Sequence, residues 1–205
     1  MVSIELPFRR ATPDDARDLA EFVNMAGEGL PLYLWGQIAD ADASAWDIGF
    51  ARAKRDSGAF SYRNAILRLM GNDPVACLLG YPLDDDPPPT DYSEMPPMFV
   101  PLQQFEDLVP GTWYINAIAT KEGQRGKGYG NELLALAENI AASLGKRGLS
   151  LILADTNVGA RRLYTGLGYR EVAQRGMVKE RWVHPGKDWI LMAKDLGTGA
   201  AESRA

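Results

Sequence analysis

The sequence is poor in the residues that cross-link a chain covalently or hold transition metals. Its 205 residues include one cysteine, Cys77, and one histidine, His184. A single cysteine excludes an internal disulfide and is compatible with a reducing compartment. One cysteine and one histidine are also too few for a His/Cys metal cluster. We therefore expect a cytoplasmic protein without a metal site.

A basic excess and long apolar runs are also absent. The chain has 22 Lys and Arg against 27 Asp and Glu, a formal net charge of −5, whereas general nucleic-acid-binding proteins usually have a basic excess. No apolar run reaches the roughly 18 residues of a membrane-spanning helix. The start, MVSIELPFRR, lacks the continuous apolar region of a secretory signal. The composition thus argues against nucleic acid and membranes as partners, and it leaves a homodimer open.

Neither Cys77 nor His184 is a convincing catalytic group in the sequence. Cys77 lies in the apolar run VACLLGY, residues 75–81, where thiols are usually buried and inert. His184 lies in VHPGKDW, residues 183–189, whose Pro-Gly pair marks a turn.

The most informative segment is TWYINAIATKEGQRGKGYGN, residues 112–131, in which a β-rich run passes through a glycine-rich turn into a helical pattern. Closely spaced glycines leave backbone N–H groups uncovered at the positive end of a helix dipole, which favours a phosphate or pyrophosphate ligand. The spacing of these glycines matches neither a Walker A loop nor a dinucleotide-binding fingerprint. The turn instead fits R-x-x-G-x-G over residues 125–130. A tight strand-to-helix connection that needs positive φ is the alternative for this segment alone.

A second segment, TNVGARRLYTGLGY, occupies residues 156–169. It has the pattern N-x-x-A-x-x-L-Y followed by G-x-G-aromatic. If Asn157 opens a helix, Tyr164 lies two turns later on nearly the same face. Alternatively, Asn157 is an ordinary N-cap and Tyr164 a core aromatic.

The two segments together resemble the signatures of the GNAT superfamily of N-acyltransferases, whose specific motifs here span residues 112–170. The resemblance implies an α/β fold: one domain with a mixed sheet flanked by helices, in which two central parallel strands splay apart. We expect this domain over residues 1–196 and a disordered tail over 197–205.

The order of elements agrees with this fold class. Strands are predicted near residues 4–12, 64–70, 75–81, 112–120, 149–155, 169–178 and 188–196. Thr12 and Pro13 mark a helix start, and Ala16, Leu19, Ala20 and Val23 recur at helical spacing after it. A weaker helical region contains Trp46, Phe50 and Ala53. The helix that follows the glycine turn should bury Leu133, Leu136 or Ala137, Ile140 and Leu144, and end at Gly145.

Residues 84–110 interrupt this pattern with an acidic, proline-rich insertion. They contain seven prolines, seven acids and no Lys or Arg. Loops this long are more often functional or mobile than regular. The five acids between Asp84 and Glu94 could recruit a cationic substrate by charge, or the segment could be a solvated excursion without a task.

The resemblance also implies a ligand, acetyl-CoA, and the residues that hold it. Its pantetheine would pair with the backbone near Ile118 and Thr120. Its pyrophosphate would bind the segment Arg125, Gly126, Lys127, Gly128, Tyr129, Gly130 and Asn131, and Asn157 would hold the cofactor further along.

The implied reaction is direct transfer of the acetyl group to an amine, with Tyr164 as proton donor to the leaving thiolate and no metal. Many family members place a glutamate on the strand before the glycine loop as the base, but this chain has Asn116 there, which can position an acceptor but cannot take up a proton. The base is left unassigned.

The acceptor site is implied to include Asn116, Tyr33 and Trp35, although both aromatics could simply pack in the core. The acceptor would be a small cationic amine or a protein amino group. The alternative function is a non-catalytic acyl-CoA sensor or interaction domain, which the missing carboxylate at position 116 favours slightly.

Overall fold

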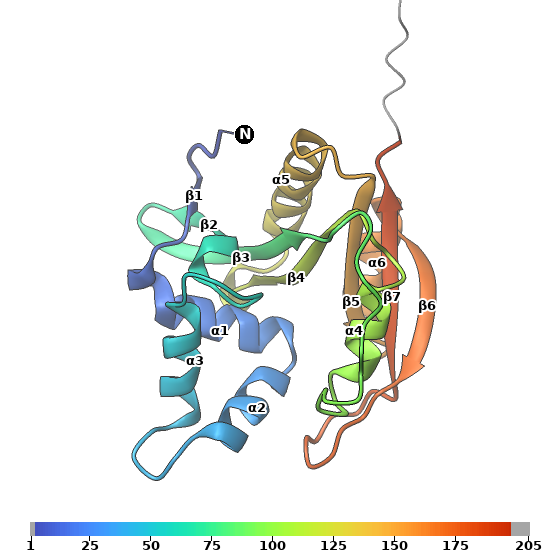
Figure 1. Ribbon diagram of the computed structural model, residues 1–205. Coiled ribbons are helices and arrows are strands. Elements are labelled where there is room, and N and C mark those ends of the chain that lie inside the picture. The colour runs from blue at the N-terminus through green and yellow to red at the C-terminus, as the bar shows by residue number, and fades with distance from the viewer. Residues whose placement is uncertain (1–2, 198–205) are drawn as a thin grey trace, which may run out of the picture.

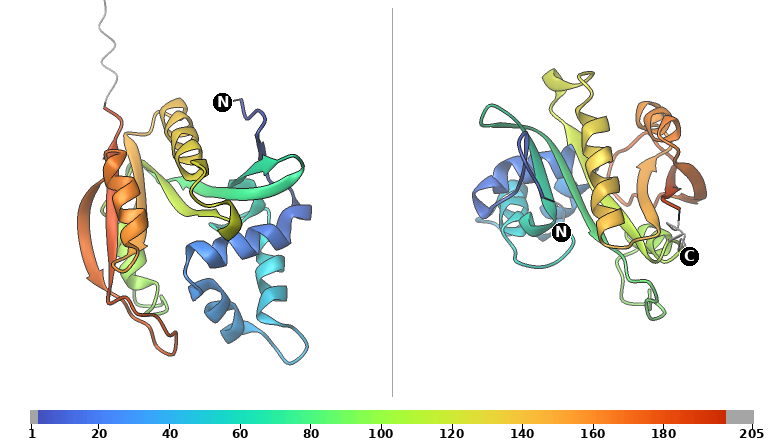
Figure 2. Two further views of the ribbon diagram at one scale, coloured as in Figure 1. Left: turned by 180° about the vertical axis from the view of Figure 1, so that it is seen from behind. Right: turned by 90° about the horizontal axis from the view of Figure 1, so that it is seen from above.

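A seven-stranded mixed sheet organises the protein in the computed structural model, which describes residues 3–197. The strand order is β1-β2-β3-β4-β5-β7-β6, and helices cover both faces of the sheet (Figures 1 and 2). The strands are β1 (Phe8–Arg10), β2 (Ala65–Met70), β3 (Asp73–Pro82), β4 (Thr112–Thr120), β5 (Gly148–Ala154), β6 (Arg170–Gly176) and β7 (Asp188–Asp195).

The helices are α1 (Ala16–Ala26), α2 (Leu30–Ile38), α3 (Ala45–Ala53), α4 (Val100–Glu106), α5 (Tyr129–Ser143) and α6 (Val158–Gly166), with short 3-10 turns η1 (Pro13–Asp15), η2 (Tyr62–Asn64) and η3 (Glu122–Gln124). Thr12 and Asp15 form a capping box ahead of α1, at the helix start that the sequence predicts. The expected tail lies outside the described residues, apart from Gly197.

Alternate residues of the central strands pack into two different hydrophobic cores, one on each face of the sheet. On β3, Cys77 and Leu79 pack with α1 and α3, whereas Ala76 and Leu78 pack with α5 and α6. This follows from the two-residue period of a strand, whose successive side chains point to opposite faces of the sheet. Both faces of the central strands are therefore buried under helices.

The parallel strands β4 and β5 pair only at one end. Their register runs from Thr112↔Gly148 to Ile115↔Leu151, although β4 continues to Thr120. A buried hydroxyl pair, Thr112 Oγ1 and Ser150 Oγ at 2.7 Å, joins the strands at the paired end. Beyond Ile115 the strands diverge (Figure 1), which confirms the expected splayed fold.

Several expectations need correction. The insertion is not a continuous loop, because α4 forms within it. Three residues of the insertion, Met98, Phe105 and Val109, also pack in a hydrophobic core with residues of β7. Strand β1 covers only three residues instead of 4–12. The exposed fraction of Leu144 is 48%, so it is not on the buried face of α5, which consists of Leu133, Leu134, Ala137 and Ala141.

Candidate functional site

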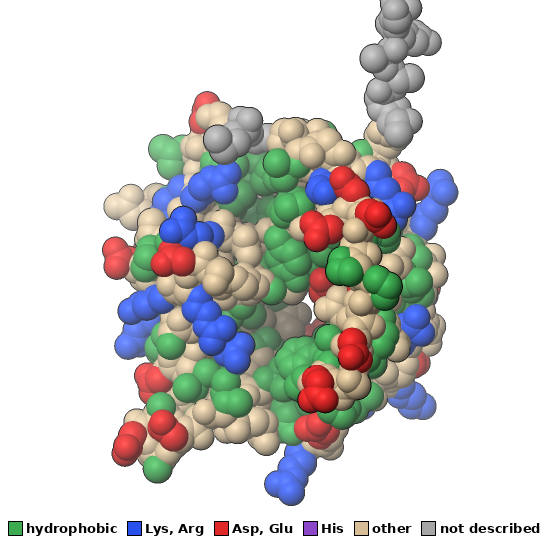
Figure 3. All heavy atoms as spheres, viewed as in Figure 1, with side chains coloured by type: hydrophobic (Ala, Val, Ile, Leu, Met, Phe, Trp, Pro, Cys, Tyr) green, Lys and Arg blue, Asp and Glu red, His purple; other side chains and the backbone are tan. Residues whose placement is uncertain are grey.

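A cavity of about 1240 Å³ lies where β4 and β5 diverge. Its walls come from both strands, α2, α6, the α1–α2 connection, the end of α3 and the segment before α4. A hollow lined mainly by hydrophobic side chains is visible at the centre of the molecule (Figure 3). Of the residues singled out in the sequence, the cavity is lined by Trp35, Asn116, Ile118, Thr120, Arg125, Gly130, Asn157 and Tyr164.

Asn116 reaches this cavity because of a β-bulge. In the pairing of β3 with β4, Leu79 faces Ala117 and the next residue, Gly80, faces Ile115. Asn116 is therefore the extra residue of the bulge, and its side chain is exposed between two buried neighbours. Bulges bend a strand and redirect a side chain, often beside active sites.

The glycine turn ends in the first turn of α5. Gly126 and Gly128 have φ of 76° and 88°, a left-handed conformation that favours glycine, and a Cβ at either position would meet nothing within 4 Å. At the start of α5 the Glu132 N–H donates to Gly128 O at 3.1 Å. The preceding N–H groups belong to the helix terminus, where no intrahelical partner exists.

The charged and aromatic residues of the turn contact neighbouring groups of the protein. Arg125 donates from Nε to Thr120 O at 3.3 Å, and Lys127 donates from Nζ to Gln124 Oε1 at 2.7 Å. The ring of Tyr129 lies 3.7 Å from the Arg68 guanidinium. Gly126, Lys127, Gly128, Tyr129 and Asn131 do not belong to the cavity lining within the described part of the chain.

Helix α6 presents Asn157 and Tyr164 to the cavity. Asn157 is the N-cap, and its Oδ1 accepts the Ala160 N–H at 3.2 Å. Tyr164 is buried against Tyr169, with ring centroids 5.7 Å apart. Burial raises the pKa of Tyr164 to about 12, so its hydroxyl is protonated at neutral pH.

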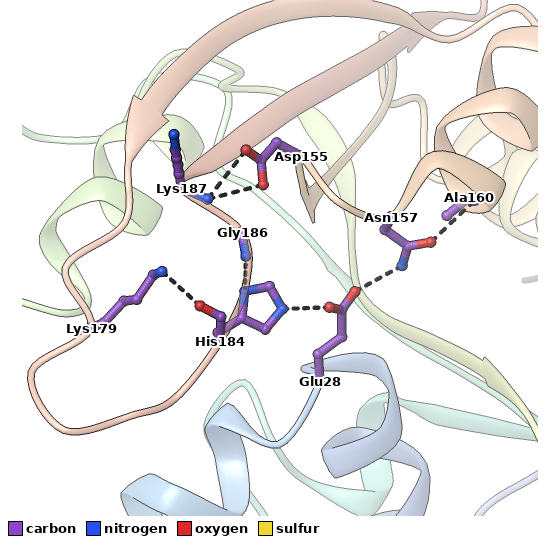
Figure 4. A network of polar contacts seen from close by, with 8 residues as sticks. All are labelled: Glu28, Asp155, Asn157, Ala160, Lys179, His184, Gly186 and Lys187. Carbon is purple, nitrogen blue, oxygen red and sulfur yellow. Dashed lines mark hydrogen bonds and ion pairs between the residues drawn. The ribbon is translucent and has the colours of Figure 1, made fainter.

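Glu28 and His184 form a polar network that the sequence does not indicate (Figure 4). Glu28 lines the cavity from the α1–α2 connection, and its carboxylate contacts Asn157 Nδ2 at 2.9 Å and His184 Nε2 at 2.6 Å. The one signal in the chain is the setting of Glu28 between Gly27 and Gly29, which is typical of a helix end. The turn around His184 gives no indication of a partner.

Two expected substrate contacts lie differently. Trp35 is buried, stacks on Phe60 with centroids 5.6 Å apart, and still forms part of the cavity wall. Tyr33 is outside the lining of the described cavity. Its hydroxyl accepts the Arg181 N–H at 3.3 Å and lies 3.4 Å from Glu180 Oε2.

The acidic residues of the insertion also lie away from the cavity. Asp85 pairs with Lys146 at 2.9 Å. Asp84 lines a separate pocket of about 210 Å³ together with Glu106 and Asp107. None of the five acids between residues 84 and 94 is part of the larger cavity's described lining, so their placement gives no support to recruitment of a cation.

Cys77 is buried, and burial raises the pKa of its thiol, in agreement with an inert side chain. Within residues 3–197 no cluster of three or more His, Cys, Asp or Glu could hold a metal ion. The described helices are all too short or too polar to cross a membrane.

Comparisons with known proteins agree with this geometry. A family model described as acetyltransferase (GNAT) family matches residues 35–169. The fold is similar to a solved acetyltransferase (TM-score 0.63, 20% identity, 93% of this chain and 99% of that chain). It is also similar to an N-acetyltransferase from Staphylococcus aureus Mu50 (TM-score 0.64, 20% identity, 91% and 98% of the two chains). At such identities the likeness concerns the fold alone. No curated protein matches the sequence.

Proposed function

Because the chain belongs to the acetyltransferase (GNAT) family, we propose that it binds acetyl-CoA in the cavity and transfers the acetyl group directly to an amine. The observation that carries the proposal is the meeting of two features at one cavity. The first is the glycine turn at the start of α5, of which Arg125 and Gly130 line the cavity, and the second is Asn157 and Tyr164 on α6.

The cofactor would follow the free edge of β4. Beyond Ile115 this edge has no pairing with β5, so its backbone near Ile118 and Thr120 could pair with the amides of pantetheine. At Thr120 O, such a bond would replace the one that this oxygen accepts from Arg125 Nε. The pyrophosphate would accept hydrogen bonds from the backbone N–H groups of residues 125–131. The helix dipole and the charges of Arg125 and Lys127 favour an anion there. Asn157 would hold the cofactor on the opposite wall.

The chemistry would then be an attack of the amine nitrogen on the thioester carbonyl. Tyr164, protonated at neutral pH, is the proposed donor to the leaving sulfur. Asn116, placed on the cavity by its bulge, would position the acceptor. Trp35 would provide an apolar wall of the acceptor site. Tyr33 would act from the edge of that site, where its hydroxyl accepts the Arg181 N–H.

The acceptor is an amine, either a small cationic molecule or a protein amino group. The cavity wall carries charges of both signs, with Arg52 and Arg55 at the end of α3 and Glu28 at the α1–α2 connection. A non-catalytic acyl-CoA-binding role is the second candidate, favoured by Asn116 in place of a carboxylate.

Acetyl-CoA binding is tested with one residue of the glycine turn. At a hundredfold excess over the dissociation constant, acetyl-CoA should stabilise the fold by about 2.7 kcal/mol. Gly130 lines the cavity with an ordinary φ, and a Cβ there meets only Leu163 at 3.7 Å. Gly130→Val should fold and lose the thermal shift, because its side chain covers the N–H groups. Gly123→Val, with nothing within 4 Å, is the matched control. A full shift in Gly130→Val contradicts the assigned loop.

Catalysis is tested by thiol release from acetyl-CoA with a panel of amines: alkyl amines, diamines, amino acids and peptides with free N-termini. Release with at least one amine supports the transferase. Tight acetyl-CoA binding without release with any of them supports the sensor.

A further inference from the structure

We propose that Glu28 takes up the proton of the acceptor's ammonium group, and that His184 is a positioning residue that holds the Glu28 carboxylate for this task. The proposal rests on the transferase function above and names the base that the sequence leaves unassigned. Four features of the described residues carry it: backbone strain, two hydrogen bonds, a fixed histidine tautomer and the arrangement of competing carboxylates.

The backbone of Glu28 is strained. Its φ is 51°, in the left-handed region, which is unfavourable for an L-residue with a side chain. The flanking residues are glycines that would adopt such angles easily, yet the glutamate occupies the strained position. Strain of this kind persists where the surrounding structure holds a residue in place, often at functional sites.

Each carboxylate oxygen of Glu28 has one donor. Asn157 Nδ2 donates to Oε1 at 2.9 Å and His184 Nε2 contacts Oε2 at 2.6 Å. The orientation of Asn157 is fixed, because its Oδ1 accepts the Ala160 N–H. Figure 4 shows the carboxylate between α6 and the loop before β7. The carboxylate therefore adjoins the proposed cofactor ligand Asn157.

His184 is held in one tautomer. The Gly186 N–H donates to Nδ1 at 3.0 Å, so Nδ1 is the acceptor and Nε2 carries the hydrogen that is donated to Glu28. The ring is buried and stacks on Trp182 at 4.5 Å with an interplanar angle of 16°. Gly186 permits this approach, since a Cβ there would lie 2.9 Å from the imidazole.

Two other carboxylates are less suited. Glu180 lines the cavity, and its φ is also positive at 49°, but its described partner is the Tyr33 hydroxyl. Glu106 belongs to the separate smaller pocket, and Tyr81 lies 3.5 Å from it. Glu28 alone among the three combines a cavity position with contact to Asn157.

Protons and bonds balance over the proposed reaction. The ammonium gives one proton to the Glu28 carboxylate, and the free amine forms a bond to the thioester carbon. As the carbon–sulfur bond breaks, the sulfur receives a proton from the Tyr164 hydroxyl and the nitrogen loses its second proton to the tyrosyl oxygen. The products are the amide and free CoA thiol, and Glu28 then returns its proton to water.

The test compares three glutamine variants with an amine that the thiol-release panel identifies. Glu28→Gln should lower kcat/KM at neutral pH by roughly 10²–10⁴ and keep the thermal shift with acetyl-CoA. Its rate should rise tenfold per pH unit up to the pKa of the amine, because only free amine then reacts. Glu180→Gln, which removes the other carboxylate of the cavity wall, should lower the rate much less than Glu28→Gln, because Glu180 has no contact with Asn157. Charged groups of the same polar network include Lys179, which donates to the His184 carbonyl, and Asp155, which accepts the Lys187 N–H. The described cavity wall also carries Arg52, Arg55, Arg125 and Glu180.

Four outcomes overturn the proposal. A wild-type rate in Glu28→Gln removes Glu28 from the mechanism while leaving the transferase intact. A loss of kcat/KM in Glu180→Gln equal to that in Glu28→Gln indicates a general effect of negative charge at the cavity. A large loss of kcat/KM in Glu106→Gln alone assigns the base to the smaller pocket. Absence of thiol release by the wild type refutes the transferase itself, and with it this proposal. If Glu28→Gln does not fold, Glu28→Gly is the second variant, because the positive φ at position 28 suits glycine. The same loss of kcat/KM is expected for it.

His184 is tested by a double-mutant cycle. His184→Phe keeps an aromatic ring on Trp182 but removes the donor, and should lower kcat/KM about tenfold or more. In the Glu28→Gln background the same substitution should have almost no effect, because there is no carboxylate left to position. A loss of equal size in both backgrounds indicates a purely structural role and refutes the positioning role.

Discussion

Replacing Glu106 with glutamine should remove a pH dependence of stability that originates in α4. Burial raises the pKa of the Glu106 carboxyl to about 7 from an ordinary 4.5, and repulsion from Asp107 adds to the rise. The folded protein thus holds this proton more tightly than the unfolded chain. The stabilising contribution is fully present below about pH 4.5 and is lost as the pH rises through 7.

The size of the effect follows from the shift. Between about pH 5.5 and 8, a group with these two pKa values reduces the free energy of unfolding by about 2 kcal/mol. The glutamine side chain of the variant is neutral throughout, so the stability of Glu106→Gln relative to the wild type should grow by that amount over this range. Urea denaturation at several pH values measures the difference directly.

Glu94→Gln is the matched control, since it removes the same charge from an exposed position of the same insertion. Its difference from the wild type should stay nearly constant with pH. A constant difference for Glu106→Gln as well would refute the reasoning, because it would mean that the carboxyl is ionised equally in the folded and unfolded chains.

Further outcomes are expected at other positions. Tyr164→Phe should leave acetyl-CoA affinity nearly unchanged and lower turnover by roughly 10²–10⁴, less with thioesters of more acidic thiols; wild-type turnover would remove Tyr164 from the mechanism. Gly80→Ala should destabilise the fold by about 1–3 kcal/mol in urea denaturation, because a Cβ would lie 2.3 Å from the Trp113 ring, whereas Gly159→Ala, in open space, should not. Neutralising the run 84–86 to asparagine should leave the acceptor KM unchanged even at low salt, since these acids do not line the cavity; a rise in KM would restore recruitment by the insertion.

Features set by neighbouring residues could be predicted from the sequence. Thr12 and Asp15 cap the first helix within four residues, and the glycines around position 128 open α5 because only their backbone conformation suits the turn. Asn157 and Tyr164 share a helix face by spacing alone. Helical and strand periods are local properties, so the order of elements followed from them, and the two local motifs were enough to indicate the splayed fold.

Features that join distant segments were decided only by the tertiary structure. Glu28 and His184 lie 156 positions apart in the sequence, and the sequence around either residue does not indicate that the two are in contact. The bulge that exposes Asn116 depends on the register between β3 and β4. Helix α4 depends on the packing of its apolar residues against β7. Pairing register and packing partners are settled by the whole sheet and its cores, because a short segment cannot encode which distant surface will bury it.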